Sequence, residues 1–238
     1  VVEAVGALIL SVEFWRKGIL PLKAMACGVF HSVAAFCNAG FSLFSRNLTE
    51  YASDVVVVLT VSLLLIGGGL GFTVITDIYR RYVRREVRSL SAHSRLVILV
   101  TIILVASAGL GVGVLEWRGV LGPLPAMGRA LNAYFQGVTP RTAGFNTLNI
   151  GNLTAPTLFL LVILMFIGAS PGGTGGGIKT TTLGTVIAAI WSVLRGRRNV
   201  AIFERRVPRE LVERALVVFV LFIAILVLGT GCVSVSQK

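Results

Sequence analysis

Three long stretches of this chain carry no charged residue, and they constrain the fold more than any other feature. They cover residues 55–75, 96–115 and 215–235, and each is 20 or 21 residues long. A helix rises about 1.5 Å per residue, so about 20 apolar residues cross the roughly 30 Å of hydrocarbon in a bilayer. The sequence therefore predicts an all-α membrane protein surrounded by lipid, with each stretch forming one unbroken span.

The overall charge does not indicate a nucleic-acid partner. The net charge is +12, but only 13% of the 238 residues are charged and 55% are hydrophobic. Soluble domains carry about 25% charged residues. The arginines lie in short runs between uncharged stretches, which is typical of loops beside a membrane. We therefore expect membrane lipid and no nucleic acid as a partner.

A fourth apolar stretch, residues 157–194, is interrupted. Its only charge is Lys179, and as one helix it would be about 57 Å long, which exceeds the bilayer. Glycine and proline break helices, so we expect two half-helices joined by an irregular loop that is buried or lines a water-filled path. The residues of this break are Gly168, Ala169, Ser170, Pro171, Gly172, Gly173, Thr174, Gly175, Gly176 and Gly177.

Lys179 directly follows this break, and its sequence context leaves two interpretations open. A lysine near a membrane can extend its ammonium group to the interface. It can also supply a fixed positive charge that lines or gates an inner pore. The segment resembles a phosphate-binding loop only superficially, because Ile178 stands where that motif requires a glycine before the lysine. We therefore expect no nucleotide site here.

The distribution of arginine predicts the orientation. Residues 77–95 hold six arginines and residues 195–214 hold seven, whereas residues 116–156 hold three. Positive loops lie on the cytoplasmic side, which places residues 116–156 and 16–53 outside. We expect a multi-pass protein of the inner or plasma membrane. The chain begins and ends in apolar helical segments, so we also expect a fragment of a larger protein.

The two outside segments repeat one another. Residues 30–33 (FHSV) match residues 135–138 (FQGV), 105 positions apart, and the AGF triplets that begin at Ala39 and Ala143 are 104 apart. An Asn-Leu-Thr triplet follows in each copy. Two spans separate the copies, so the repeat is parallel. The apolar segments ahead of the triplets are too short to cross a bilayer, and we expect re-entrant pore helices over 24–36 and 127–137.

The glycine-bearing triplets suit a cation filter. An alkali cation that enters a membrane exchanges its water shell for other oxygens, and rings of backbone carbonyls supply them. Glycine reaches backbone angles that let successive carbonyls point inward. A single AGF triplet would more simply be a helix-cap turn, but two parallel copies favour a K⁺ filter built from backbone carbonyls. Its residues are Asn38, Ala39, Gly40, Phe41, Thr142, Ala143, Gly144 and Phe145.

The remaining polar residues indicate no catalytic or metal site. His31 and His93 stand apart from any cysteine or carboxylate cluster, and we expect them at a helix end or in a loop. The carboxylates Asp54, Asp77 and Glu116 lie at span ends. No paired carboxylates occur within the spans, so we expect no enzyme.

Four motifs together resemble the Trk/Ktr/HKT superfamily of potassium transporters, and most closely its KtrB/TrkH type. They are residues 35–42 (AFCNAGFS), 139–146 (TPRTAGFN), 168–182 (GASPGGTGGGIKTTT) and 68–72 (GGLGF). The resemblance implies helix–pore-loop–helix (M1-P-M2) repeats in a parallel pseudo-fourfold arrangement, with one broken helix acting as a gate. It implies K⁺, possibly also Na⁺, as the transported ion, no cofactor, a homodimer, and KtrA/TrkA-type nucleotide-binding regulatory subunits.

The same resemblance divides the chain into five parts. Residues 1–78 correspond to the end of the first helix, the pore loop and the second helix of repeat 2. Residues 96–194 correspond to a complete repeat 3 with a broken second helix, and 215–238 to the truncated first helix of the next repeat. Residues 79–95 and 195–214 are the cytoplasmic basic loops. The alternative is a secondary transporter of another solute that binds at the broken helix.

Overall fold

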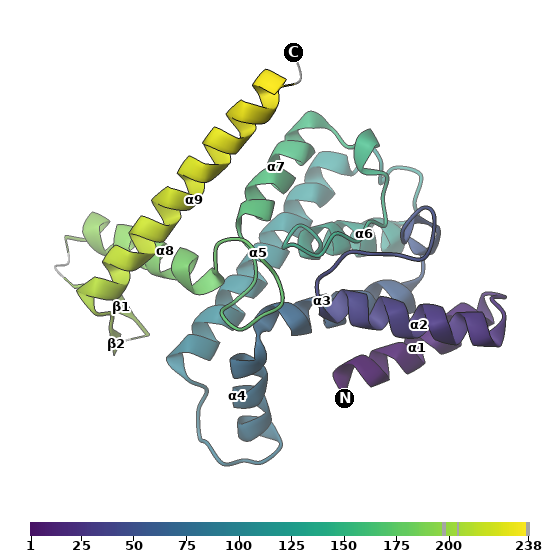
Figure 1. Ribbon diagram of the computed structural model, residues 1–238, viewed down its shortest axis with the longest axis horizontal. Coiled ribbons are helices and arrows are strands. Elements are labelled where there is room, and N and C mark those ends of the chain that lie inside the picture. The colour runs from purple at the N-terminus through teal and green to yellow at the C-terminus, as the bar shows by residue number, and fades with distance from the viewer. Residues whose placement is uncertain (197–198, 204, 237–238) are drawn as a thin grey trace.

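The computed structural model describes residues 1–196, 199–203 and 205–236, and it is built almost entirely of helices (Figure 1). The longer helices run in the order α1 Val2–Arg16, α2 Pro21–Phe36, α3 Val55–Leu70, α4 Phe72–Tyr82, α5 Ala92–Glu116, α6 Ala126–Val138, α7 Ala155–Phe166, α8 Thr180–Leu194 and α9 Arg209–Ser236. Two single-turn 3₁₀ helices, η1 Thr49–Tyr51 and η2 Ile150–Asn152, lie next to the repeated Asn-Leu-Thr triplets: η1 begins at the last residue of the first triplet, and η2 ends at the first residue of the second.

In the part of the chain that the structure describes, two helices are long and apolar enough to cross a membrane by themselves. They are α5, with 25 residues, and the segment Arg209–Thr230 of α9. Both coincide with predicted spans. The short helices α2 and α6 lie where re-entrant helices were predicted. Among the described residues, the exception to the all-α prediction is a small antiparallel hairpin in the second basic loop, in which β1 (Ala201–Ile202) pairs with β2 (Arg205–Arg206).

The prediction of one unbroken span over residues 55–75 was wrong. Helix α3 ends at Leu70, and α4 leaves it at an angle of 102°. Gly71 makes the bend possible because its φ is +84°, and a Cβ there would lie 2.6 Å from the carbonyl oxygen of Pro171. The sequence predicted one broken helix. The described part of the structure also has a break at Gly71, which contacts the loop between α7 and α8.

The predicted interruption of the fourth apolar stretch is confirmed. Helix α7 ends at Phe166, α8 begins at Thr180, and residues 167–179 form an irregular loop between them. A parallel bridge pairs Ile167 with Ile178 at the neck of the loop. The ends of the two half-helices therefore lie close together, and the glycine-rich segment projects from them.

The helices pack as two similar units. Helix α1 packs against α2, and α5 packs against α6 in the same way, while α3 contacts both α2 and α6 (Figure 1). The largest cluster of buried apolar side chains joins the units around Phe14, Phe135, Phe145 and Leu48. This cluster holds the segments that follow α2 and α6 in fixed positions beside one another.

Candidate functional site

The segments after the two short helices have the same backbone conformation. Asn38 and Gly40 have φ values of +51° and +71°, and Thr142 and Gly144 have values of +66° and +76°. A positive φ is uncommon for residues other than glycine. The internal repeat therefore extends from sequence to backbone geometry, at the positions predicted for the filter.

The two segments approach each other most closely at their glycines. A Cβ on Gly40 would lie 2.6 Å from the carbonyl oxygen of Ala143, and one on Gly144 would lie 3.1 Å from the Cα of Gly40. Farther along, the Leu48 amide donates to the carbonyl of Asn146 at 3.0 Å. The Asn146 amide donates to Oδ1 of Asn47 at 3.2 Å. Backbone contacts thus bring together the two predicted filter segments.

The phenylalanines that end the two segments have opposite environments. Phe145 is fully buried, whereas Phe41 is 69% exposed. The Phe145 ring lies 6.2 Å from the ring of His31 on α2. The second segment therefore packs against α2 of the first unit through Phe145, whereas Phe41 of the first segment is exposed.

His31 is a structural partner of the first segment, which the sequence analysis missed. It was expected at a helix end or in a loop, but it lies in the middle of α2 and is fully buried. One ring nitrogen lies 2.7 Å from the carbonyl oxygen of Cys27, and the other 2.9 Å from Oγ of Ser42. The repeat aligns His31 with Gln136, which is also fully buried. The repeat alignment of His31 with Gln136 was the sequence signal that could have indicated a shared structural role. His93, by contrast, lies at the start of α5, as expected.

Arg141 is a second residue that the sequence analysis did not single out. It precedes Thr142 and is only 8% exposed. Within the described residues, Nε and one terminal nitrogen of its guanidinium group have no hydrogen-bond partner. A buried cation thus lies directly behind one of the two segments.

The glycine-rich loop contacts both segments. Nδ2 of Asn38 donates to the Thr174 hydroxyl at 2.8 Å, and this hydroxyl donates to the carbonyl of Phe36 at 2.9 Å. A Cβ on Gly175 would collide with the Thr142 hydroxyl. The structure therefore brings together the residues predicted for the filter and those predicted for the gate.

The break between α3 and α4 holds the loop in place. The amides of Ser170 and Thr174 donate to the carbonyls of Gly69 and Gly68 at 2.9 and 3.1 Å. The Phe72 amide donates to the carbonyl of Gly172 at 3.3 Å. The last carbonyls of a helix have no intrahelical donors, so the loop supplies the donors that the end of α3 lacks.

Lys179 folds back onto the loop. Its Nζ donates to the carbonyl of Gly175 at 2.9 Å, and the side chain is half-buried. The Ser170 and Thr180 hydroxyls lie 2.8 Å apart beside it. The lysine thus places a positive charge against the Gly175 carbonyl of the loop.

These features define a class: a multi-pass membrane protein in which two short helices and the glycine-bearing segments that follow them lie against an irregular loop between two half-helices. The chain belongs to the TrkH family of cation transport proteins, whose model matches residues 2–237. This is a family of transporters and not of enzymes.

Curated relatives align along the whole chain. It is 36% identical over 244 residues to Ktr system potassium uptake protein B of Bacillus subtilis (strain 168), covering 100% of this chain and 53% of that protein. It is 35% identical over 245 residues to Ktr system potassium uptake protein B of Vibrio alginolyticus (100% and 52%). It is 34% identical over 245 residues to potassium/sodium uptake protein NtpJ of Enterococcus hirae (100% and 52%). The chain spans about half the length of these relatives.

A solved structure shares the fold. The crystal structure of the potassium transporter TrkH from Vibrio parahaemolyticus superposes with a TM-score of 0.71 at 18% identity. The match covers 94% of this chain and 47% of that one. The arrangement of helices described above is thus a known fold.

Proposed function

We propose that this chain forms part of the pore of a potassium uptake protein. The observation that carries the proposal is the shared backbone of the two glycine-bearing segments, which meet at Gly40 and Gly144. Backbone carbonyls can replace the hydration shell of K⁺. The filter residues are those predicted from the sequence: Asn38, Ala39, Gly40, Phe41, Thr142, Ala143, Gly144 and Phe145.

The complete pore has four such segments in a parallel pseudo-fourfold ring, of which this chain supplies the second and third. Residues 1–78 belong to repeat 2, residues 96–194 form repeat 3, and residues 215–238 begin the next repeat. Residues 79–95 and 195–214 face the cytoplasm. The repeat offset and the coverage of about half of each relative support this division.

The glycine-rich loop acts as the gate beneath the filter. It comprises Gly168 to Gly177, and Lys179 holds it closed through the carbonyl of Gly175. The contacts of Thr174 with Asn38 and Phe36 support this role, because they join the loop directly to the filter segment. Motion of the loop would open the path below the filter.

The protein works in the cell membrane as a homodimer with cytoplasmic nucleotide-binding regulatory subunits of the KtrA/TrkA type. The arginine-rich loops are the candidate docking surfaces. The names of two relatives, which describe each as protein B of a Ktr system, support a multicomponent assembly. The name of a third includes sodium, so Na⁺ is a second candidate ion.

The test is rubidium uptake by a potassium-starved bacterium that lacks its own uptake systems and expresses the complete protein. Gly144→Ser is compared with Gly151→Ser, because Gly151 has room for a side chain and lies outside the filter. We expect K⁺ to compete with rubidium uptake by the unmodified protein. Gly144→Ser should lower this uptake or allow Na⁺ to pass, and Gly151→Ser should not change it. Normal expression without alkali-cation flux would instead favour a secondary transporter of another solute, with the broken helices as its binding site.

A further inference from the structure

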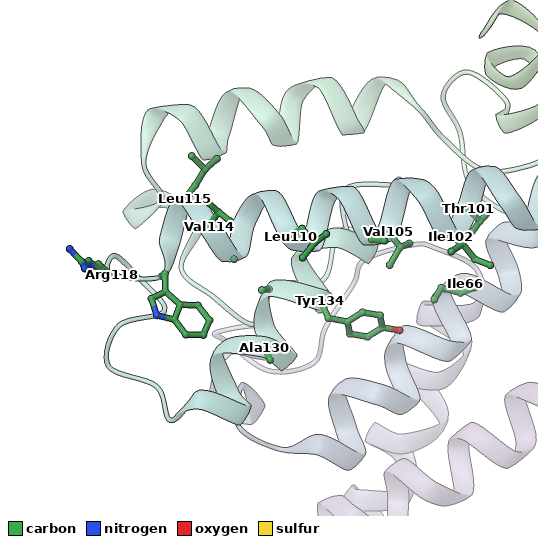
Figure 2. Close-up of a pocket in the computed structure, with 15 residues that line it drawn as sticks. Ile66, Thr101, Ile102, Val105, Leu110, Val114, Leu115, Arg118, Ala130 and Tyr134 are labelled. Atoms are coloured by element: carbon green, nitrogen blue, oxygen red, sulfur yellow. The ribbon is translucent and has the colours of Figure 1, made fainter. Parts of the chain in front are cut away.

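An open apolar groove runs along one face of the second unit. Its volume is about 1040 Å³, slightly above the roughly 300–1,000 Å³ of small-molecule sites. Helices α3, α5 and α6 form its walls, and Arg118 lies at one end while Ile66 and Thr101 lie at the other (Figure 2). The groove therefore has an elongated shape with a charged end.

Small residues on α5 create the groove. Gly109 and Gly113 lie one turn apart and face α6, where Ala133 is their nearest neighbour. A Cβ on Gly113 would lie 3.6 Å from the Cβ of Ala133, which is ordinary contact. Both glycines line the groove, so a large side chain at Gly113 would occupy part of its volume.

A tryptophan and an arginine mark the mouth. Trp117 is 46% exposed and lines the groove, and the Arg129 guanidinium lies 5.3 Å from the centre of its ring. Arg129 also donates to the carbonyls of Leu124 and Gly122, at 2.8 and 2.6 Å. Tryptophan and arginine at the end of an apolar surface are typical of the interface between lipid and water.

Arg118 is the cation at this end that remains available. Arg129 is held by its two carbonyl contacts, and Arg141 is buried. Arg118 is exposed, and its side chain makes no hydrogen bond or ion pair with the described part of the chain. The nearby carboxylate of Glu116 is buried and accepts from the amide and hydroxyl of Thr154 at 2.8 and 2.7 Å. Arg118 can therefore meet an external anion.

The first unit repeats the arrangement. Helix α1 ends with Trp15 and Arg16, as Trp117 and Arg118 follow α5. A second apolar groove, of about 680 Å³, lies between α1 and α2 and includes Trp15. Arg16, however, pairs with Glu13 at 3.3 Å. The two grooves thus share an apolar body and differ in the charge available at the mouth.

We propose that the larger groove binds an anionic phospholipid, with an acyl chain between α5 and α6 and the phosphate at Arg118. The apolar lining matches the chain and the unpaired arginine matches the headgroup charge. The arginine distribution places this mouth in the outer leaflet. Lipid binding in this groove depends on the protein lying in a membrane. It does not depend on which ion the protein transports.

The test is native mass spectrometry of the complete protein, released from detergent with phosphatidylglycerol or phosphatidylcholine. We expect preferential retention of phosphatidylglycerol. Arg118→Gln removes one cation near the headgroup, so we expect roughly fivefold weaker binding. Gly113→Leu fills the groove and should abolish retention of this lipid. Rubidium uptake by the same variants checks that they are folded.

Two matched controls separate this site from general effects. Arg46→Gln removes an exposed arginine from the other outside segment, and Gly229→Leu adds the same side chain to α9, where a Cβ meets nothing within 4 Å. Both should retain the lipid as the unmodified protein does. Three results would each overturn the proposal. They are equal retention of phosphatidylcholine, unchanged lipid binding in Gly113→Leu, and retention of no lipid because the rest of the protein closes the groove.

Discussion

Gly40 combines two demands that alanine cannot meet. Its φ is +71°, and a Cβ would lie 2.6 Å from the carbonyl oxygen of Ala143. The left-handed conformation alone costs an L-residue about 1–2 kcal/mol. Gly40→Ala should therefore lower thermal stability and also reduce rubidium uptake by displacing the second segment. Gly18→Ala is the matched control, because Gly18 has a φ of +92° but nothing within 4 Å. Equal loss of uptake in both variants would contradict a role for the close approach.

At the residue scale, the sequence predicted the positions where the backbone is unusual but not the side chains behind them. Gly40 and Gly144 were recognisable because the triplet occurs twice. His31 and Arg141 were missed because their burial depends on how the two units face each other, and no local pattern encodes that. The different exposure of Phe41 and Phe145 has the same origin.

At the scale of the helix, the neighbouring glycines Gly67 and Gly68 of α3 differ in how closely other segments pack against them. A Cβ on Gly68 would overlap the carbonyl oxygen of Phe36, whereas one on Gly67 would lie 3.7 Å from the Phe36 ring, in ordinary contact. We expect Gly68→Ala to push α2 and the glycine-rich loop away from α3 and to destabilise the protein by about 1–3 kcal/mol. Gly67→Ala should be neutral or slightly stabilising, because alanine favours a helix. Thermal unfolding in detergent compares the two, and similar midpoints would argue against tight packing here.

The connection between α4 and α5 has a pH-dependent contact. Asp77 lies beyond the apolar run and accepts from the Ser94 hydroxyl at 2.6 Å and the Ser91 amide at 3.1 Å. Hydrogen bonds from Ser91 and Ser94 hold the pKa of Asp77 below its usual value of 3.8. Because the folded pKa is depressed, the contact stabilises the fold above pH 3.8 and is lost as the pH falls through the lower folded value. The stability difference between Asp77 and Asp77→Asn should shrink over that range, and a constant difference would contradict the contact.

The sequence predicted the break after α7 and missed the break after α3, for a physical reason. The first contains Pro171 and a dense run of glycines, which no helix tolerates. The second has only Gly71 at the bend, and a run of glycines in an apolar helix equally indicates close packing. The amides of Ser170 and Thr174 in the loop donate to the carbonyls at the end of α3, and these hydrogen bonds favour the bend over a straight, closely packed helix. Those donors come from a segment about a hundred residues away, so the local sequence does not reveal the bend.

At the scale of the whole molecule, one chain of contacts connects the first segment predicted for the filter, the glycine-rich loop and the bent helix. Asn38 contacts Thr174, and the Thr174 amide in turn contacts Gly68. The sequence predicted a filter and a gate as separate motifs, but not that Thr174 would contact the segments predicted for both. The assignment of the chain to repeats 2 and 3 of a fourfold ring stays a prediction, because it concerns segments outside this chain.

Thr174 offers the sharpest test of this connection. Its hydroxyl accepts from Asn38 and donates to Phe36, and Thr174→Val keeps the shape while removing both hydrogen bonds. Each bond contributes about 0.5–1.5 kcal/mol, so losing both should shift the balance between closed and open loop roughly 5- to 150-fold toward open. Rubidium flux into vesicles without regulatory subunits should rise accordingly. Thr182→Val, on α8 beyond the loop, should leave the flux unchanged. A flux that falls in Thr174→Val at equal protein content would mean that these bonds support conduction, and that the loop does not act as a gate in this way.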